Sequence, residues 1–292
     1  MRLILSGAAL YLFTALALRL LAQPAPNTSW FTLVSSRPLV IAHADDAGTS
    51  PWPGDTLLFL ENAAALGVDV LEMNVHLSAD GHIILIHDDT VDDTTDGTGP
   101  VAEKTLAELK ALDAAYDWTQ DGGQTFPYRG TGITIPTLEE VFQRLPDWPM
   151  IVEIKGASPG LPETLCSLVR QSGMENRVII PSSNDASIAD FRTRCPEIAT
   201  AAATEEVRQF VILNFLFLAN PFTPPYHAHQ VPIESGGIPV ITQSFVNAAH
   251  RRNLEIHAWT INDPDKMQRL IEMGVDGIMT DRPEVLLDLL GR

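Results

Sequence analysis

Basic residues are scarce in this 292-residue sequence, which contains 19 Lys and Arg against 37 Asp and Glu, a formal net charge of −18. A nucleic-acid binder needs basic surface to neutralise phosphates, so the composition excludes that class. It also argues against attraction to anionic lipid headgroups through a polybasic patch. An acidic protein that acts on an anionic substrate needs a local remedy, either a few focused cationic side chains or a bound metal ion.

One hydrophobic run is long, from Leu3 to Ala22 (LILSGAALYLFTALALRLLA), and the polar, Pro-containing stretch Gln23–Ser29 follows it. The run predicts a single membrane anchor, in which Arg19 reaches the interface, or a cleaved secretory signal peptide. A buried N-terminal helix of the globular domain is a third option. We assign residues 1–30 to this segment and its linker. The bulk of the chain is then expected outside the cytoplasm, anchored to the membrane or, after cleavage, secreted.

Short apolar runs rich in β-branched residues alternate with amphipathic stretches after residue 38. The runs are nearly continuous, as in strands buried on both faces of a parallel sheet. We expect strands at 39–43, 70–75, 83–87, 150–155, 178–181, 198–202, 255–260 and 277–280. This pattern predicts an α/β fold, a TIM-type (β/α)8 barrel over residues 38–292, preceded by an N-terminal hydrophobic helix. The Ser-Ala-Asp-Gly sequence ending at Gly81 indicates a hairpin-like link between strands two and three.

The helical stretches between these runs carry end signals. Thr105 and Thr137 each stand three residues before a Glu, the spacing of a capping box. Cys166 falls in the first turn of one expected helix, and Cys195 at the end of the next. Because consecutive barrel helices run parallel, the two positions would lie about 15 Å apart at 1.5 Å per residue. A disulfide does not span that distance, so we expect two free, mostly buried thiols.

The segment Phe210–Phe222 (FVILNFLFLANPF) is strongly apolar but too short to span a bilayer. We expect a buried barrel helix there, with an apolar lid that contacts lipid or acyl chains as the alternative. His227 and His229 follow in a predicted Pro-rich loop.

Polar side chains stand at the carboxyl ends of several expected strands, where active sites of this fold lie. Residues two apart in a strand share one face, so these side chains should converge. They are His43, Glu72, Asn74, His87, Asp88, Glu153, Lys155, Trp259, Thr280 and Asp281.

The residue types indicate chemistry on a phosphate ester. Glu72, Asn74 and Glu153 offer oxygen donors, which suit a hard divalent cation such as Ca²⁺ or Mg²⁺. Lys155 adds a fixed positive charge beside them. Histidines from two strands, His43 and His87, can act as general base and general acid. Cation and Lys would together offset charge on the phosphorus oxygens while the His pair moves protons.

Six stretches carry a resemblance to a known family. They are IAH at 41–43, GVDVLEMNVHLSADGHIILIHDDTVDDTTDGTG at 67–99, IPTLEEVF at 135–142, VEIK at 152–155, HAWTIND at 257–263 and GVDGIMTDRP at 274–283. In this order they resemble the glycerophosphodiester phosphodiesterase family. The resemblance implies a TIM-type barrel that uses a divalent cation to hydrolyse glycerophosphodiesters to an alcohol and sn-glycerol 3-phosphate.

The same resemblance implies roles for individual residues. The paired histidines map onto His43 and His87, and the phosphate-facing lysine maps onto Lys155. The metal-binding E-x-D maps onto Glu72 and Asn74, and the third metal carboxylate maps onto Glu153. In the mechanism often proposed for the family, the glycerol 2-hydroxyl attacks phosphorus, and water then opens the cyclic phosphate while the histidines exchange roles.

The sequence departs from the family pattern near the expected site. Ala44 stands where the family has a phosphate-contacting Arg, and Asp93 replaces a second Arg. Gly54 replaces a Glu, for which Asp55, Asp46 or Asp45 could substitute from a shifted loop. Asn74 replaces the Asp of E-x-D, which removes one negative charge from the metal ligands.

Three functions remain open. The first is a phosphodiesterase of altered substrate preference. Trp259 would form an apolar wall for the glycerol or the leaving group, or would simply pack. The second is lysophospholipase D-type hydrolysis of lysophospholipids, favoured by the anchor and by Phe210–Phe222. The third is a catalytically weak barrel that binds a ligand, favoured by Ala44 and Asn74. All three involve a small-molecule partner and, through the N-terminal segment, a membrane; no obligate protein partner is evident.

Overall fold

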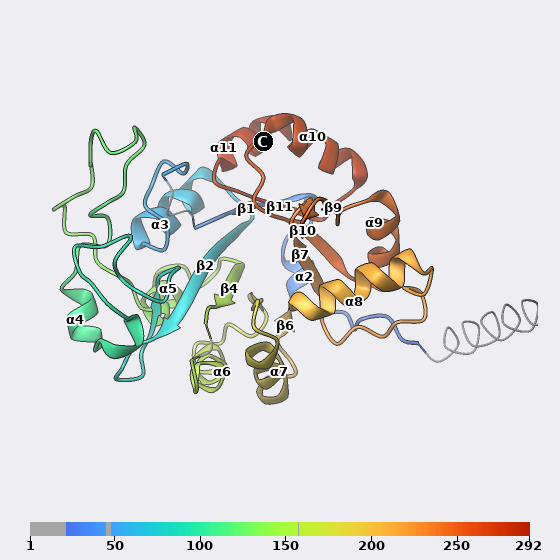
Figure 1. Ribbon diagram of the computed structural model, residues 1–292, viewed down its shortest axis with the longest axis horizontal. Coiled ribbons are helices and arrows are strands. Elements are labelled where there is room, and N and C mark those ends of the chain that lie inside the picture. Colours follow the sequence, from blue (N-terminus) through green and yellow to red (C-terminus); the bar gives the residue numbers. More distant parts are fainter. Residues whose placement is uncertain (1–21, 45–47, 157) are drawn as a thin grey trace, which may run out of the picture.

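The computed structural model describes residues 22–44, 48–156 and 158–292. Eight parallel strands form its central barrel in the order β6-β5-β4-β2-β1-β11-β10-β7. A parallel bridge between Ala201 and Ala228 links the two ends of this order, so the ring is nearly closed (Figure 1). The strands are β1 (Leu39–Ala42), β2 (Val70–Leu77), β4 (Met150–Ile154), β5 (Val178–Ile180), β6 (Ala199–Thr200), β7 (Ala228–Val231), β10 (Glu255–Ala258) and β11 (Gly277–Thr280). The predicted TIM-type barrel is confirmed.

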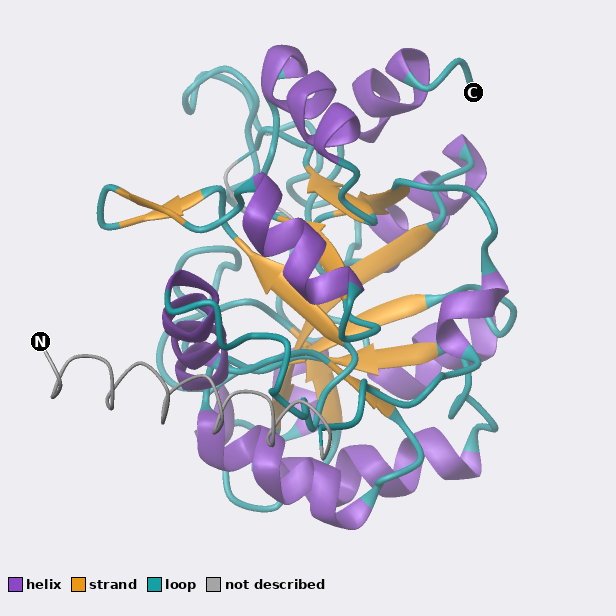
Figure 2. Cartoon of the chain, turned by 90° about the vertical axis from the view of Figure 1, so that its right-hand side faces the viewer, coloured by secondary structure: helices purple, strands orange, loops and turns teal. Residues whose placement is uncertain are grey.

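Helices cover the outside of the barrel (Figures 1 and 2). They are α2 (Trp30–Leu33), α3 (Leu57–Leu66), α4 (Leu106–Lys110), α5 (Leu138–Arg144), α6 (Leu161–Gln171), α7 (Asp185–Arg194), α8 (Thr204–Phe215), α9 (Gln243–His250), α10 (Pro264–Met273) and α11 (Pro283–Leu289), with a 3-10 turn η1 (Val101–Glu103). Both predicted capping boxes form: Thr105 caps α4 and Thr137 caps α5, each with the Glu three residues on.

The predicted hairpin after β2 is confirmed, but it changes the identity of the eighth barrel strand. β3 (Ile83–Leu85) pairs antiparallel with β2, so it is no member of the parallel ring, contrary to our expectation. The missing strand is β7, which lies in the region predicted as a Pro-rich loop. With the sequence AHQV, β7 contains two polar residues and shows no continuous apolar run, so periodicity did not reveal it.

Small and branched side chains fill the barrel interior. Leu39 and Ile41 of β1, Val70 of β2, Ile151 of β4 and Met279 of β11 belong to one buried cluster there. Trp30 of α2 joins this cluster and stacks on His257 with ring centroids 5.6 Å apart. The amino-terminal end of the barrel is thereby closed, which leaves the carboxyl ends of the strands as the place for a site.

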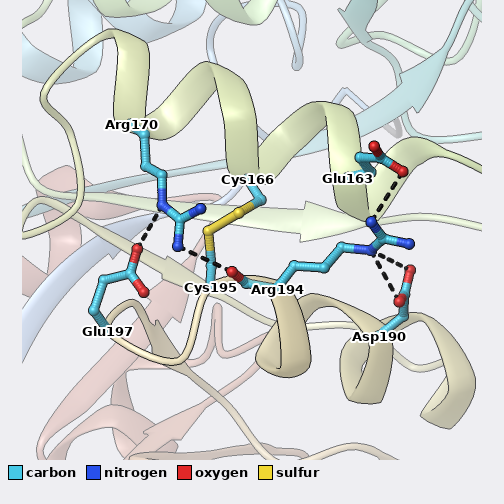
Figure 3. The surroundings of a disulfide bond; sticks show 7 residues. All are labelled: Glu163, Cys166, Arg170, Asp190, Arg194, Cys195 and Glu197. Carbon is cyan, nitrogen blue, oxygen red and sulfur yellow. Dashed lines mark hydrogen bonds and ion pairs between the residues drawn. A yellow bond between two sulfur atoms is a disulfide. The ribbon is translucent and has the colours of Figure 1, made fainter.

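The two cysteines form a disulfide, so the prediction of free thiols is wrong. The Cα atoms of Cys166 and Cys195 are 5.9 Å apart, and Figure 3 shows the bond between the two helices. Cys166 lies in the middle of α6 and not in its first turn, while Cys195 caps the C-terminus of α7. The two helices are therefore offset along their axes, and the end of α7 lies beside the centre of α6.

The apolar segment Phe210–Phe222 is buried only in part. Phe210 of α8 is buried against Phe245 of α9, with ring centroids 5.4 Å apart. Phe215 and Phe217, at and beyond the end of α8, are exposed to solvent. Within the described residues, no helix has the length and hydropathy needed to cross a membrane. The anchor predicted from Leu3 to Ala22 falls almost wholly on residues 1–21, outside the described residues.

Candidate active site

Strand alternation directs the predicted site residues inward at the carboxyl end of the barrel. In β2, Glu72 and Asn74 follow Val70 at intervals of two, so they share its inward direction. Glu153 and Lys155 bear the same relation to Ile151 of β4. By the same count His43 follows Ile41 beyond β1, and Asp281 follows Met279 beyond β11. The inner layer of the barrel is therefore continued by five of the predicted site residues, namely His43, Glu72, Asn74, Glu153 and Lys155.

His43 is held by a carboxylate from the neighbouring strand. Its Nδ1 lies 2.6 Å from Oδ1 of Asp281, which is almost fully buried. Asp281 is fixed in turn by Asn262, whose Nδ2 donates to Oδ2 and whose Oδ1 accepts the Asp281 backbone N–H at 3.0 Å. The buried carboxylate favours a proton on Nδ1 of His43 and therefore leaves Nε2 as the atom that can exchange protons.

His87 follows β3 and is half-exposed. Its Nδ1 lies 2.8 Å from Oδ1 of Asp88, and its Nε2 lies 3.1 Å from the Nζ of Lys155. Lys155 also pairs with Glu153, whose Oε2 is 3.2 Å from Nζ. Because an ammonium only donates hydrogen bonds, Nε2 of His87 is the acceptor in this arrangement and Nδ1 carries the proton.

Glu72 is the most deeply buried carboxylate of the set. Its Oε2 accepts the backbone N–H of Ala44 at 2.8 Å, which joins the end of β1 to β2. Burial raises the pKa of Glu72 above its ordinary value, and Glu153 raises it further, whereas His43, the Ala44 N–H and Lys155 lower it. These opposing influences show that the residues lie close together.

Asn74 and Glu153 are direct neighbours across β2 and β4 in the parallel register. Asn74 donates its backbone N–H to Oδ1 of Asp55 at 2.9 Å and its side-chain Nδ2 to Oδ2 of the same residue at 3.0 Å. Asp55 is buried and has a φ of 51°, a left-handed conformation that Asp tolerates better than most residues. These two hydrogen bonds hold the Asp55 carboxylate against Asn74.

The donor set fits a hard divalent cation. Glu72, Glu153 and the free Oδ1 side of the Asn74 amide are oxygen donors on one face of adjacent strands, and amide oxygens ligate Ca²⁺ as carboxylates do. A nearby cation would also relieve the cost of burying Glu72. Within the described residues, no group of three or more His, Cys, Asp and Glu side chains has a metal-binding arrangement. The third donor here is the Asn74 amide.

Other predicted residues lie around this centre. Trp259 follows β10 and is exposed, as a wall residue at the barrel end should be. The loop at 48–52 is braced by the 116–131 loop: Gln120 donates to the Ser50 carbonyl at 3.3 Å, and the Tyr128 hydroxyl donates to the Pro51 carbonyl at 3.4 Å. His227 and His229 lie away from this site, His229 being fully buried between the barrel and the helices α8 and α9.

Sequence reasoning assigned no role to Asp281, Asp88 or Asn262. Asp281 and Asp88 were expected at strand ends. The need of each catalytic histidine for a carboxylate partner could have identified them. Asn262 belongs to the HAWTIND stretch but comes from a loop, where periodicity gives no direction. Asp55 was one of three options for a displaced carboxylate; the other two, Asp45 and Asp46, lie outside the described residues.

Comparison with known proteins identifies the family of the chain. The model of the glycerophosphoryl diester phosphodiesterase family matches residues 47–285. A glycerophosphodiester phosphodiesterase of Caldanaerobacter subterraneus subsp. tengcongensis is 33% identical over 257 residues, which cover 86% of this chain and 97% of the relative.

Solved structures share the fold. The glycerophosphoryl diester phosphodiesterase domain of an uncharacterized Mycobacterium tuberculosis protein has a TM-score of 0.74 at 24% identity, covering 88% of this chain and 100% of that chain. An Oleispira antarctica phosphodiesterase in complex with the product sn-glycerol-3-phosphate has a TM-score of 0.69 at 24% identity, covering 91% and 100%. By its family model and its curated relative, the chain belongs to the glycerophosphoryl diester phosphodiesterase family of phosphoric diester hydrolases.

Proposed function

We propose that this protein hydrolyses glycerophosphodiesters to an alcohol and sn-glycerol 3-phosphate. The observation that carries the proposal is the meeting of two carboxylate-paired histidines, His43 and His87, with Lys155 at one end of the barrel. Proton transfer and neutralisation of phosphoryl charge are the two requirements of phosphodiester cleavage, and these groups supply both. The named activity of the Caldanaerobacter relative and the product in the Oleispira structure support the same substrate class.

The side chains suggest a division of labour. Nε2 of His43 accepts the proton of the glycerol 2-hydroxyl as its oxygen bonds to phosphorus, and Asp281 stabilises the imidazolium that forms. His87 enters this step as an imidazolium, which Asp88 stabilises: when substrate binds and Lys155 leaves Nε2 of His87, that nitrogen takes up a proton from solvent. The bond to the leaving alcohol then breaks, and that oxygen takes the proton from Nε2 of His87. Lys155 turns from His87 to the phosphoryl oxygens, whose charge it offsets. Water then opens the cyclic phosphate with the roles of His43 and His87 exchanged, and both return to their starting protonation states.

Glu72, Asn74 and Glu153 are the residues that would hold Ca²⁺ or Mg²⁺. The cation, when bound, supplies positive charge to the phosphoryl oxygens, which this site otherwise obtains mainly from Lys155 because Ala44 occupies the family's Arg position. Trp259 would form the apolar wall beside the glycerol or the leaving group.

We also propose that the barrel, residues 38–292, works outside the cytoplasm, with residues 1–30 as anchor or signal peptide. The disulfide between Cys166 and Cys195 supports this location, because such bonds persist in oxidising compartments and are rare in the cytosol. The long apolar run Leu3–Ala22 supports it independently.

The activity is tested with the purified full chain, glycerophosphocholine and Ca²⁺ or Mg²⁺, by measuring released glycerol 3-phosphate. Turnover should appear with the cation, disappear with a chelator and return when the cation is restored. His43→Asn should abolish it, whereas His82→Gln, which changes an exposed histidine in the β2–β3 turn, should not. Absence of turnover with either cation, together with its appearance in Ala44→Arg/Asp55→Asn/Asn74→Asp, would show that the natural chain is a weak, ligand-binding barrel.

Lysophospholipids are a second candidate substrate class, favoured by the exposed phenylalanines at the end of α8. The same assay with lysophosphatidylcholine, followed by choline release, compares the two. A larger kcat/KM for glycerophosphocholine supports the first proposal, and a larger value for the lysophospholipid supports the second.

A further inference from the structure

Two neighbouring protrusions expose large apolar side chains. One is the C-terminal end of α8, where Ile212, Phe215 and Phe217 are 52%, 65% and 87% exposed. The other is the hairpin of β8 (Glu234–Ser235) and β9 (Ile238–Pro239), where Ile238 is 56% exposed; Figure 2 shows this hairpin projecting from the barrel. We call these four residues the α8–hairpin patch. A cluster of this kind on a soluble domain usually marks an interaction surface.

A groove makes the patch continuous. It runs between the end of α8 and the segment that leads from β9 into α9, and Phe215, Phe217, Val240 and Phe245 contribute to its lining. Pro239, next to Ile238, lies at its edge. Asn214, Thr242 and Ser244 add polar side chains to the same lining. The two protrusions therefore border one depression and do not act as separate exposed side chains.

The surroundings of the patch are almost without charge. Residues 209–250 contain one formally charged side chain, Glu234, whereas the 19% charged content of the whole chain would place about eight in a segment of that length. In a protein of net charge −18, an anionic surface repels a segment with one charged side chain only weakly.

The described chain starts beside this region. The backbone N–H of Gln23 donates to the Oγ1 of Thr223 at 3.1 Å, in the loop that follows α8. Ala25 is fixed next to it by hydrogen bonds with Arg252 and Asn253. Figure 1 shows the start of the described chain near the free end of α8. The described residue at which the run Leu3–Ala22 joins the barrel therefore lies on the flank that carries the patch.

We propose that the α8–hairpin patch docks on a lipid bilayer and seats the barrel on the membrane surface. A run of 20 residues matches the thickness of the hydrocarbon core, and Arg19 is its one formally charged residue. Four side chains could cover only one side of such a segment, whereas a bilayer accommodates the segment and the patch together. Phenylalanines at protruding positions are suited to insertion at the level of the headgroups.

The test uses the full chain reconstituted into vesicles of phosphatidylethanolamine and phosphatidylglycerol. Because both natural cysteines are in the disulfide, Phe217→Cys and Ile238→Cys each provide one thiol for an environment-sensitive fluorophore. Ala107→Cys, on the exposed side of α4 at the opposite flank in Figure 1, is the matched control. Quenching is then measured with lipids that carry a nitroxide on the acyl chain and, separately, with aqueous iodide.

If the patch docks on the bilayer, the lipid nitroxides should quench the labels at 217 and 238 but not the label at 107. Iodide should quench the label at 107 but not the labels at 217 and 238. Equal quenching by lipid at all three positions would overturn the proposal. Protection of position 217 from both quenchers would overturn it too, because residues 1–21 or a second copy of the chain would then cover the patch. None of these outcomes depends on catalytic activity.

Discussion

The Asp55 carboxylate accepts two hydrogen bonds from Asn74, one from the backbone N–H and one from the side-chain amide. The negative charge that the family motif places at residue 74 lies instead on Asp55, one hydrogen bond away. Because Nδ2 of Asn74 donates to Asp55, Oδ1 of Asn74 points to the other side of the amide. Asn74 and Asp55 together therefore provide an oxygen ligand and a nearby negative charge, as a single Asp would.

Exchanging the two residues should therefore restore function that either single change removes. In Asp55→Asn the new amide faces the Asn74 amide, donor against donor, and in Asn74→Asp two carboxylates face each other. We expect each single variant to bind Ca²⁺ about 10- to 100-fold more weakly. Asp55→Asn/Asn74→Asp recreates a complementary pair and should bind within a few-fold of the natural chain.

Calorimetric titration of Ca²⁺, together with the cation-induced rise in Tm, measures this coupling as a double-mutant cycle. Asp121→Asn is the matched control, since Asp121 also accepts backbone N–H bonds but lies in the exposed 119–125 loop. If Asp55→Asn/Asn74→Asp binds Ca²⁺ no better than Asp55→Asn, the two residues do not act together in Ca²⁺ binding.

Asp281 should matter to turnover through His43. We expect His43→Asn to lower kcat about 10²- to 10⁴-fold, the usual contribution of a general acid–base group. Asp281→Asn should lower kcat by a smaller factor with little change in KM, because it removes the charge that stabilises the imidazolium. Steady-state kinetics with glycerophosphocholine give both numbers.

The chain supplies a matched control for that experiment. Asp276 pairs with His250 at 2.8 Å, a similar carboxylate–histidine contact, but at the amino-terminal end of β11. Asp276→Asn should therefore reduce stability without reducing kcat. A loss of kcat in Asp276→Asn as large as that in Asp281→Asn would mean that general destabilisation explains both.

The disulfide should stabilise the outer helical layer. It closes a loop with a sequence separation of 29, for which the chain-entropy model gives about 3–4 kcal/mol. Cys166→Ala/Cys195→Ala should lower the free energy of unfolding in urea by roughly that amount. A reductant should destabilise the natural chain to a similar level and leave the variant unchanged; equal stability of all samples would contradict the assignment. A thiol assay on the denatured, unreduced protein should find no free thiol.

His229 should make the fold sensitive to acid. Among the described residues neither of its ring nitrogens has a hydrogen-bond partner, and burial lowers its pKa from 6.5 to about 3. Between these values the unfolded chain binds a proton that the folded chain does not, so stability present above pH 6.5 is lost as the pH falls toward 3. The loss from this residue is about 2 kcal/mol at pH 5.

His229→Leu removes this ionisation from a pocket formed by Phe210, Tyr226 and Phe245. Urea unfolding at pH 7 and pH 5 should show the variant gaining about 2 kcal/mol relative to the natural chain on acidification. His82→Gln, which alters an exposed histidine, should show no relative gain. An unchanged difference between the two pH values would mean that His229 titrates normally in the folded protein.

Periodicity predicted what depends on local sequence. Continuous β-branched runs identified β1, β2, β4 and β11. The period of two along a strand predicted that Glu72 and Asn74 share one face of β2, and that Glu153 and Lys155 share one face of the strand that begins at Met150. Capping boxes fixed the starts of α4 and α5 in the same way, because they involve residues only three apart.

What escaped prediction depends on how distant segments meet. β7 is a strand because it lies between β10 and the end of β6, not because AHQV favours extended structure. The disulfide depends on the offset between α6 and α7, which no spacing along the chain reveals. The contact of Asp55 with Asn74 depends on how the loop before α3 folds over β2, and that loop departs from the family pattern.

Because β3 pairs antiparallel with β2 only, His43 and His87 follow strands that are held in different ways. His43 extends a strand held on both sides within the barrel, whereas His87 follows a three-residue strand whose pairing with β2 is set by the turn at 78–82. A single-residue insertion in that turn would slip the ladder by one step and turn His87 to the opposite face, with the barrel untouched. The length of this surface turn therefore determines how His87 is oriented relative to His43. A change in its length would abolish catalysis without unfolding the protein.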